Sequence, residues 1–169
     1  MNDLVQLSEL KEVLTSTCKI LTDPNDLSFA EYLKRWTDID LKTPGAIVLP
    51  TSETDCQNTM RIQPPEHWSL PNTEIGEMGI KILGGHSAWS TIGSDGIIID
   101  LSLYKGIEVH VESGTAIIKG SILSKEVAVT LAEAGFFTAL GNGNTVGAIP
   151  YFLGGGCSIT SSVTGFGSD

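Results

Sequence analysis

Two glycine-rich turns carry the residue types of this chain that are best suited to chemistry. The first follows a predicted strand and reads Lys81-Ile82-Leu83-Gly84-Gly85-His86-Ser87. Paired glycines permit positive φ and let successive N–H groups converge on an anion, as a diphosphate cradle without lysine requires. A hairpin turn with a solvent-facing histidine is the alternative interpretation, and GGHS by itself does not decide between the two.

The second turn is Gly141-Asn142-Gly143-Asn144-Thr145-Val146-Gly147, followed closely by Leu153-Gly154-Gly155-Gly156. It offers many N–H groups with little side-chain obstruction, although a tight structural loop would use the same residues. Neither turn has the GxGxxG fingerprint of a doubly wound fold or the Gly-Lys-Ser/Thr of a P-loop. A dinucleotide bound here would therefore need a different fold to hold it.

Composition and charge limit the partners. The chain has 169 residues, of which 41% are hydrophobic, enough for a single core of ordinary domain size. Its formal net charge of -10 predicts no binding to nucleic acid or to an anionic membrane. An anionic cofactor is still compatible with this charge, because backbone N–H groups bind phosphate without a basic side chain.

The cysteines and the N-terminus indicate the compartment. Cys18, Cys56 and Cys157 form no CxxC pair, so we expect buried free thiols, with neither a disulfide framework nor a metal site. The segment MNDLVQLSELKEVL lacks a basic and apolar leader, and no stretch reaches transmembrane length. These features predict a cytoplasmic location.

Periodicity predicts helices and strands that would position the two turns. Ser8, Ser52 (or Thr51) and Ser124 are candidate N-caps, and Gly135 is a candidate helix stop. We expect more strand after the last helix. The expected helices cover residues 8–21, 28–39, 51–62 and 124–136, and the expected strands cover 46–50, 78–83, 96–102, 107–112 and 115–122.

Six sequence blocks, taken in this order, carry a resemblance to a known family: PGAIVLPTSETD, GGHS, GIIIDLSLYKGIEV, a helix ending LAEAGF, GNTVGAIPYFLGGG and TGFGSD. From about Pro44 to Asp169 it resembles the PCMH-type FAD-binding domain shared by vanillyl-alcohol oxidase, para-cresol methylhydroxylase, berberine bridge enzyme and 6-hydroxynicotine oxidase. The resemblance implies an α+β fold with FAD between two subdomains. We expect an N-terminal helical extension (1–43), a first FAD-binding subdomain (44–103) and an incomplete second one (104–169).

The resemblance also implies roles for single residues. His86 stands where many members bond the flavin covalently, and a neutral imidazole has the free lone pair that such a bond needs. A cysteine that often forms a second flavin bond is replaced by Gly143, so a bicovalent flavin is not expected. The residues expected to contact FAD are Ile82, Leu83, Gly84, Gly85, His86, Ser87, Thr145, Val146, Gly147, Gly154 and Gly155.

The implied activity is that of a flavin-dependent oxidoreductase, in which a small-molecule substrate passes a hydride to flavin and oxygen reoxidises it. In the family a substrate domain follows the block that matches TGFGSD, so we expect a truncated fold without it. His67 and His110 lie in no family motif, and no general base can be named. Two alternatives stay open: a non-catalytic flavin-binding fragment, and an interaction domain that has lost FAD.

Overall fold

The computed structural model describes residues 3–61, 80–81, 91–94 and 96–168. The chain separates into two compact units, the first comprising Met1–Lys81 with Gly85–Leu103 and the second comprising Ile82–Gly84 with Tyr104–Asp169. Each unit has a hydrophobic core of its own. Apart from Ile82–Gly84, the boundary between the two units therefore falls between Leu103 and Tyr104.

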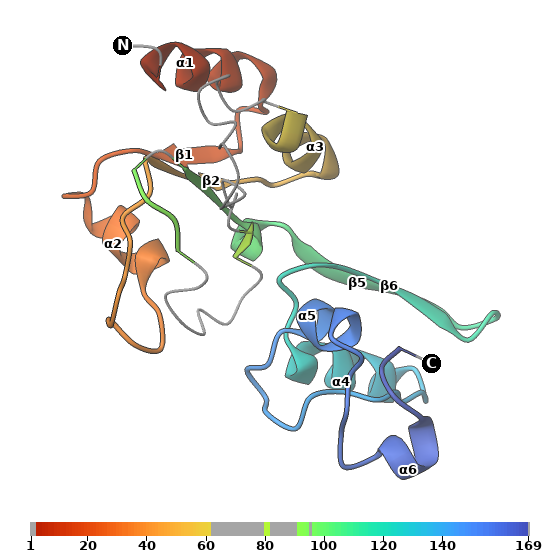
Figure 1. The fold of residues 1–169 in the computed structure, drawn as a ribbon. Helices are drawn as coiled ribbons and strands as arrows, with labels where there is room; N and C mark the ends of the chain where they lie inside the picture. Colours follow the sequence, from red (N-terminus) through yellow and green to blue (C-terminus); the bar gives the residue numbers. More distant parts are fainter. Residues whose placement is uncertain (1–2, 62–79, 82–90, 95, 169) are drawn as a thin grey trace, which may run out of the picture. The chain divides into compact units, whose positions relative to one another are not determined.

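The first unit is built on a four-stranded sheet with the order β1-β2-β4-β3 (Figure 1). Its strands are β1 (Lys19–Leu21), β2 (Ala46–Leu49), β3 (Ile80–Lys81) and β4 (Ile97–Asp100). β1 runs antiparallel to β2, whereas β2 and β3 both run parallel to β4. All four residues of β2 are buried, as expected for an unbroken apolar run at the centre of a sheet.

The core of the first unit joins the sheet to the N-terminal segment. Helix α2 (Leu27–Leu33) is capped by the Asp26 carboxylate, which accepts a hydrogen bond from the Ser28 N–H at 2.7 Å. It places Phe29, which is 1% exposed, against Ile47, Leu49 and Ile98. The first forty-odd residues thus contribute to the core of this unit.

The N-terminal segment differs from the expected helix over 8–21. Helix α1 spans Asp3–Val13, so Ser8 lies inside the helix and is not its N-cap, and residues Lys19–Leu21 form β1. The chain leaves the helix where Thr15 turns to bond Asp55 on α3 (Glu53–Arg61). Pairing along β2 then satisfies the backbone of β1 and brings Leu21 onto the core. Tertiary contacts therefore override the helical spacing of this stretch.

Asp55 is the buried charge that joins three elements of this unit. Its side chain is fully buried, and its carboxylate accepts hydrogen bonds from the N–H and hydroxyl of Thr15 and from those of Thr51, at 2.8 to 3.2 Å. Burial opposes ionisation, but these bonds together with Ser52 lower the pKa of Asp55 to about 2. The Ser52 hydroxyl in turn accepts the Asp55 N–H at 3.1 Å, which confirms Ser52 as the N-cap of α3.

The second unit holds a β-hairpin and the α4 helix. Strands β5 (Lys105–His110) and β6 (Thr115–Gly120) pair antiparallel, and α4 spans Ser124–Glu133. Ile122, Val127 and Leu131 form the core with Ala148, and Ile107, Val109 and Ile118 of the hairpin pack against it. Both strands and the helix confirm the predicted elements, although Leu123 occupies the N-cap position expected for Ser124.

Helix α4 ends just before Gly135, the residue predicted to stop it. Gly135 has φ of +81°, and the Phe136 N–H donates to the Leu131 carbonyl at 2.8 Å, the pattern of a Schellman motif. The strand expected beyond it is not formed: two short helices, α5 (Ala148–Leu153) and α6 (Ser161–Thr164), occur there. The longest described helix, α1, has 11 residues, and no described helix is long and apolar enough to cross a membrane.

We predict that Asp55→Asn lowers the free energy of unfolding by about 2 kcal/mol or more, because the amide keeps only one acceptor oxygen for the Thr15 and Thr51 donors that the buried carboxylate accepts. The folded pKa of about 2 lies below the ordinary value of 3.8. The contribution of Asp55 is therefore complete above about pH 4 and is lost as the pH falls towards 2. Urea unfolding of parent and variant across this range measures both effects.

The control for this experiment is Glu53→Gln, on the same helix but exposed and bonded only to Gln57 among the described residues. It should change the unfolding midpoint by less than about 0.5 kcal/mol. Equal losses in both variants, or an Asp55→Asn curve with the same acid dependence as the parent, would contradict the assignment.

Candidate functional site

The residues expected to form the first turn, Ile82–Ser87 with His86, lie outside the described residues. Their starting point is described, because Lys81 ends β3 and pairs with Asp100 at the end of β4. Thr51 follows β2, so the chain segments that leave β2, β3 and β4 start from one edge of the sheet. In open sheets with parallel strands, ligands bind outside this carboxyl edge.

Asp100 and Arg35 are charged residues at this edge that the sequence did not reveal. Asp100 is 1% exposed, and its Oδ1 accepts the Ser102 N–H at 2.9 Å. The Arg35 guanidinium donates to the carbonyls of Leu33 and Lys34 at the end of α2. Burial lowers the pKa of Arg35, and the nearby Asp100 carboxylate acts in the opposite direction. An aspartate closing an apolar strand, as in GIIID, was the available signal for Asp100, whereas no local pattern indicates its approach to Arg35.

The second turn is anchored to the beginning of α4. The Ser124 N–H donates to the Val146 carbonyl at 2.8 Å, and the Lys125 N–H donates to the Asn144 carbonyl at 3.3 Å. Gly147 forms an antiparallel bridge with Leu123. Gly147 is buried, whereas Thr145 and Val146 are exposed. The helix thus fixes the turn by its backbone, and the Val146 side chain packs over Gly141 and Gly143, where an added Cβ would lie 2.7 and 3.1 Å from its methyl carbons.

Several main-chain N–H groups of this turn are unpaired among the described residues. In the described part of the chain, the Val146 N–H returns to the Gly143 carbonyl, while the N–H groups of residues 142–145 have no hydrogen-bond acceptor. The Ser124 hydroxyl beneath the turn is buried and likewise has no described partner. Unpaired donors in succession are what an anionic group requires of a turn that lacks basic side chains.

The glycines after α5 are held by a second set of bonds. The Gly156 carbonyl accepts the Tyr151 hydroxyl at 2.7 Å and the Gly167 N–H at 2.8 Å, and the Ser168 N–H donates to Gly155. Thr145–Gly147 precede α5, and Gly154–Gly155 follow it. The two predicted groups of contact residues therefore lie at opposite ends of one short helix.

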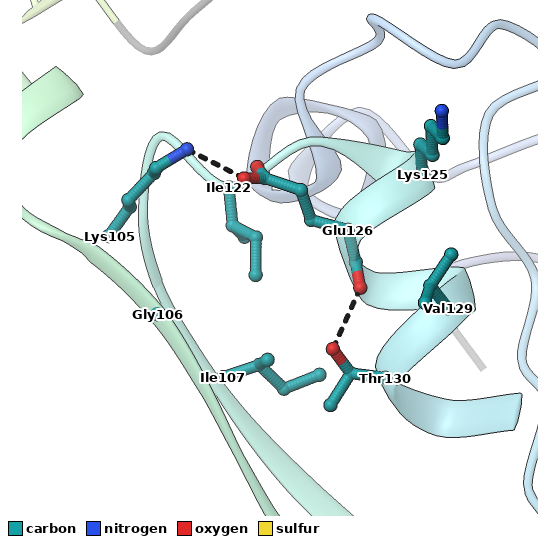
Figure 2. A pocket seen from close by; sticks show the side chains of 8 residues that line it. All are labelled: Lys105, Gly106, Ile107, Ile122, Lys125, Glu126, Val129 and Thr130. Carbon is teal, nitrogen blue, oxygen red and sulfur yellow. Dashed lines mark hydrogen bonds and ion pairs between the residues drawn. The ribbon is translucent and has the colours of Figure 1, made fainter. Parts of the chain in front are cut away.

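A groove in the second unit lies beside β5 and beneath α4 (Figure 2). It measures about 620 Å³. One end is closed by an ion pair between Lys105 and Glu126 at 2.6 Å. The Lys105 hydrogen bond, together with the Leu123 N–H, lowers the pKa of Glu126. None of the predicted contact residues lines this groove, whose lining residues are Lys105, Gly106, Ile107, Ile122, Lys125, Glu126, Val129 and Thr130.

The cysteines are free, and the environments of Cys18 and Cys56 suit no nucleophile. Burial, followed by the nearby Asp55 carboxylate and Cys56, raises the pKa of Cys18 to about 11. Burial and Asp55 also raise the pKa of Cys56. Both thiols are partly buried, but Cys157 is exposed, so the expectation of three buried thiols is wrong at that position.

Comparison with known proteins gives this geometry its context. No protein-family model matches the chain. It is 32% identical over 145 residues to "FAD-linked oxidoreductase hasG" of Aspergillus fumigatus, covering 85% of this chain and 29% of that protein. It is 29% identical to "FAD-linked oxidoreductase chyH" of Penicillium rubens, covering 88% of this chain and 28% of that protein.

Solved structures show the same relationship at the level of the fold. Berberine bridge enzyme from Eschscholzia californica superposes with a TM-score of 0.73 at 26% identity, over 96% of this chain and 33% of that one. 6-Hydroxy-D-nicotine oxidase from Arthrobacter nicotinovorans gives 0.77 at 22% identity, over 91% and 32%.

The chain has the vanillyl-alcohol oxidase and berberine bridge enzyme type of FAD-binding fold, and its curated relatives are FAD-linked oxidoreductases. This confirms the resemblance and the α+β fold class drawn from the block order. The chain spans about 30% of the length of the curated relatives that it matches.

We predict that Gly156→Ala destabilises the second unit by about 2 to 4 kcal/mol, because Gly156 has φ of +64° and a Cβ there would lie 2.7 Å from the Gly167 Cα. Gly155→Ala is the matched control: φ is +90°, but a Cβ would meet open space, so only the backbone cost of about 1 kcal/mol remains. Thermal unfolding separates the variants, and equal losses would contradict the close packing at Gly156.

Proposed function

We propose that this chain supplies an FAD-binding surface to an oxidoreductase that passes a hydride from a small-molecule substrate to flavin and then to oxygen. The observation that carries the proposal is the match to FAD-linked oxidoreductases over 85 to 88% of the chain, joined to the fold match over 96%. FAD, when bound, supplies the hydride acceptor, and the polypeptide supplies binding, orientation and electrostatics.

The residues present fit an anionic dinucleotide despite the net charge of -10. The unpaired N–H groups of residues 142–145 provide donors that do not depend on lysine or arginine. In the sequence the first turn directly follows Lys81, the last residue of β3, which pairs with Asp100 at the end of β4. The residues that would hold FAD are those of the two turns, Ile82, Leu83, Gly84, Gly85, His86, Ser87, Thr145, Val146 and Gly147, with Gly154 and Gly155.

The proposal includes one covalent link, through His86. Gly143 provides no thiol for a second link, and the exposed Cys157 lies beyond α5, well past the turn. A single link is therefore the attachment that this chain's own residues allow.

A second candidate function is a flavin-binding fragment without turnover. The chain spans only about 30% of the length of its curated relatives. Most of the polypeptide that could form a substrate pocket in proteins of their length therefore lies outside the matched stretch. Among the described residues, His110 is an exposed strand residue 3.7 Å from Glu108, and it lies in no position that identifies it as a base.

We predict that acid precipitation of the flavin-loaded chain carries the flavin with the protein, and that His86→Ala releases it while still binding FAD before precipitation. The N–H donors of the turn remain in the variant, so non-covalent binding should persist. The matched control is His67→Ala, a histidine outside the GGHS block, which should retain flavin like the parent. Flavin that leaves the precipitated parent, or stays with His86→Ala, would rule out this link.

We further predict that the isolated chain, loaded with FAD, produces hydrogen peroxide only at the background rate with panels of alcohols, amines and sugars. The reason is that the chain corresponds to only about 30% of the length of its curated relatives. A peroxidase-coupled assay measures this directly, with free FAD as the blank. Peroxide formation that saturates with any substrate would overturn the second candidate function and place a complete active site in these residues.

A further inference from the structure

The turn between α4 and α5 contains the only asparagine of the chain that precedes a glycine, Asn142-Gly143. Residues 142–145 are all exposed. The backbone nitrogen of a glycine can approach the side-chain carbonyl of a preceding asparagine, because no Cβ hinders the backbone conformations that this approach requires. The pair therefore places an amide that can lose ammonia beside a nitrogen that can attack it.

The hydrogen bonds of this pair leave the reacting groups accessible. In the described part of the chain, the Gly143 N–H has no acceptor, so no bond has to break before its nitrogen can attack. The Asn142 Oδ1 accepts the Ile159 N–H at 3.2 Å, and a donor at this oxygen draws electron density from Cγ and stabilises an oxyanion there. The Asn142 Nδ2, which would be the leaving group, donates to no described atom.

The second asparagine of the turn, Asn144, lacks these features. It precedes Thr145, whose β-branched side chain restricts the backbone and crowds the nitrogen. The Asn144 carbonyl also accepts the Lys125 N–H at 3.3 Å, which ties this residue to α4. Asn142 has no such bond to the helix among the described residues. The two asparagines thus share one exposed turn, and Asn144 is an internal control for the reactivity of Asn142.

We propose that Asn142 is a site of spontaneous deamidation. The Gly143 nitrogen gives its proton to solvent and forms a bond to the Asn142 Cγ, while the Cγ–Nδ2 bond breaks and ammonia leaves with a proton taken back from solvent. The product is a succinimide ring. Water then opens the ring at either carbonyl, which gives aspartate or isoaspartate, the latter with the main chain running through the side-chain methylene. Both products carry a carboxylate that the turn did not have before, and no oxidant takes part.

Deamidation and FAD binding oppose each other at this turn, a consequence that rests on the proposed function. A carboxylate at position 142 repels an anionic group held by the N–H groups of residues 142–145. Conversely, a diphosphate that accepts the Gly143 N–H keeps that nitrogen protonated and away from the Asn142 side chain. Bound FAD should therefore slow the reaction, and the deamidated chain should bind FAD more weakly.

The first experiment incubates the freshly purified chain in neutral buffer without FAD and follows the turn by peptide mass spectrometry and isoaspartate detection. Asn142 should convert at least about tenfold faster than Asn144 in the same peptide, and Gly143→Ala should slow its conversion about tenfold, because the added Cβ hinders ring closure. That Cβ would lie 3.1 Å from a methyl carbon of Val146. Val146 is exposed and can move by the small distance needed, so the variant should fold.

The second experiment adds FAD. At about ten times its dissociation constant, FAD should slow the conversion of Asn142 about tenfold, since only the unliganded chain reacts. Asn142→Asp, which reproduces one product, should raise the dissociation constant of FAD about tenfold. The matched control is Asn25→Asp, which adds the same charge at an exposed residue of the first unit and should bind FAD like the parent.

Equal conversion of Asn142 and Asn144, or a Gly143→Ala variant that deamidates at the rate of the parent, would overturn the proposal. Asn142→Asp with the FAD affinity of the parent would overturn its consequence for binding. A fresh parent that binds no FAD would contradict the proposed function and, with it, that consequence. The conversion of Asn142, measured without flavin, would still decide the deamidation itself.

Discussion

The stability of the first unit depends on one carboxylate, that of Asp55, which stays ionised although it is buried away from water. A buried charge is costly unless hydrogen bonds replace its hydration, and Asp55 obtains them from Thr15 and Thr51. Those donors stand at the end of α1 and directly after β2, while Asp55 itself is in the first turn of α3. Satisfying a single side chain therefore requires three elements to meet at one point. That point is beside the carboxyl end of β2, at the edge of the sheet where β3 and β4 also end.

Among the described residues of the second unit, no buried charge organises the packing. Backbone bonds between α4 and the 141–147 turn fix the turn, and Tyr151 with Gly167 fixes the glycines after α5. Glycine is needed where a side chain would occupy another residue's space, as at Gly156. The same scarcity of side chains leaves N–H groups of the turn open to an anion. Packing and anion binding thus make compatible demands on these residues.

The acidic composition does not conflict with an anionic cofactor. Three of the acidic side chains are engaged locally: Asp55 in its cluster, Glu126 with Lys105, and Asp26 at the cap of α2. Main-chain donors attract phosphate over short distances, whereas the net charge acts over long ones and is screened by salt. A net charge of -10 is therefore compatible with a diphosphate held by the main-chain donors of a turn.

The sequence by itself determined the features that depend on neighbouring residues. The buried strand at Ala46–Leu49, the Ser52 cap and the Gly135 stop follow from local spacing and φ preferences, and the order of the blocks revealed the fold. Tertiary structure alone decided the rest. Lys19–Leu21 became a strand because an open edge of β2 and the bonds of Thr15 outweighed its helical period. Asp100 and Arg35 approach each other through folding, since residues 65 positions apart carry no local signal of contact. The placement of His86 stays a prediction from the sequence.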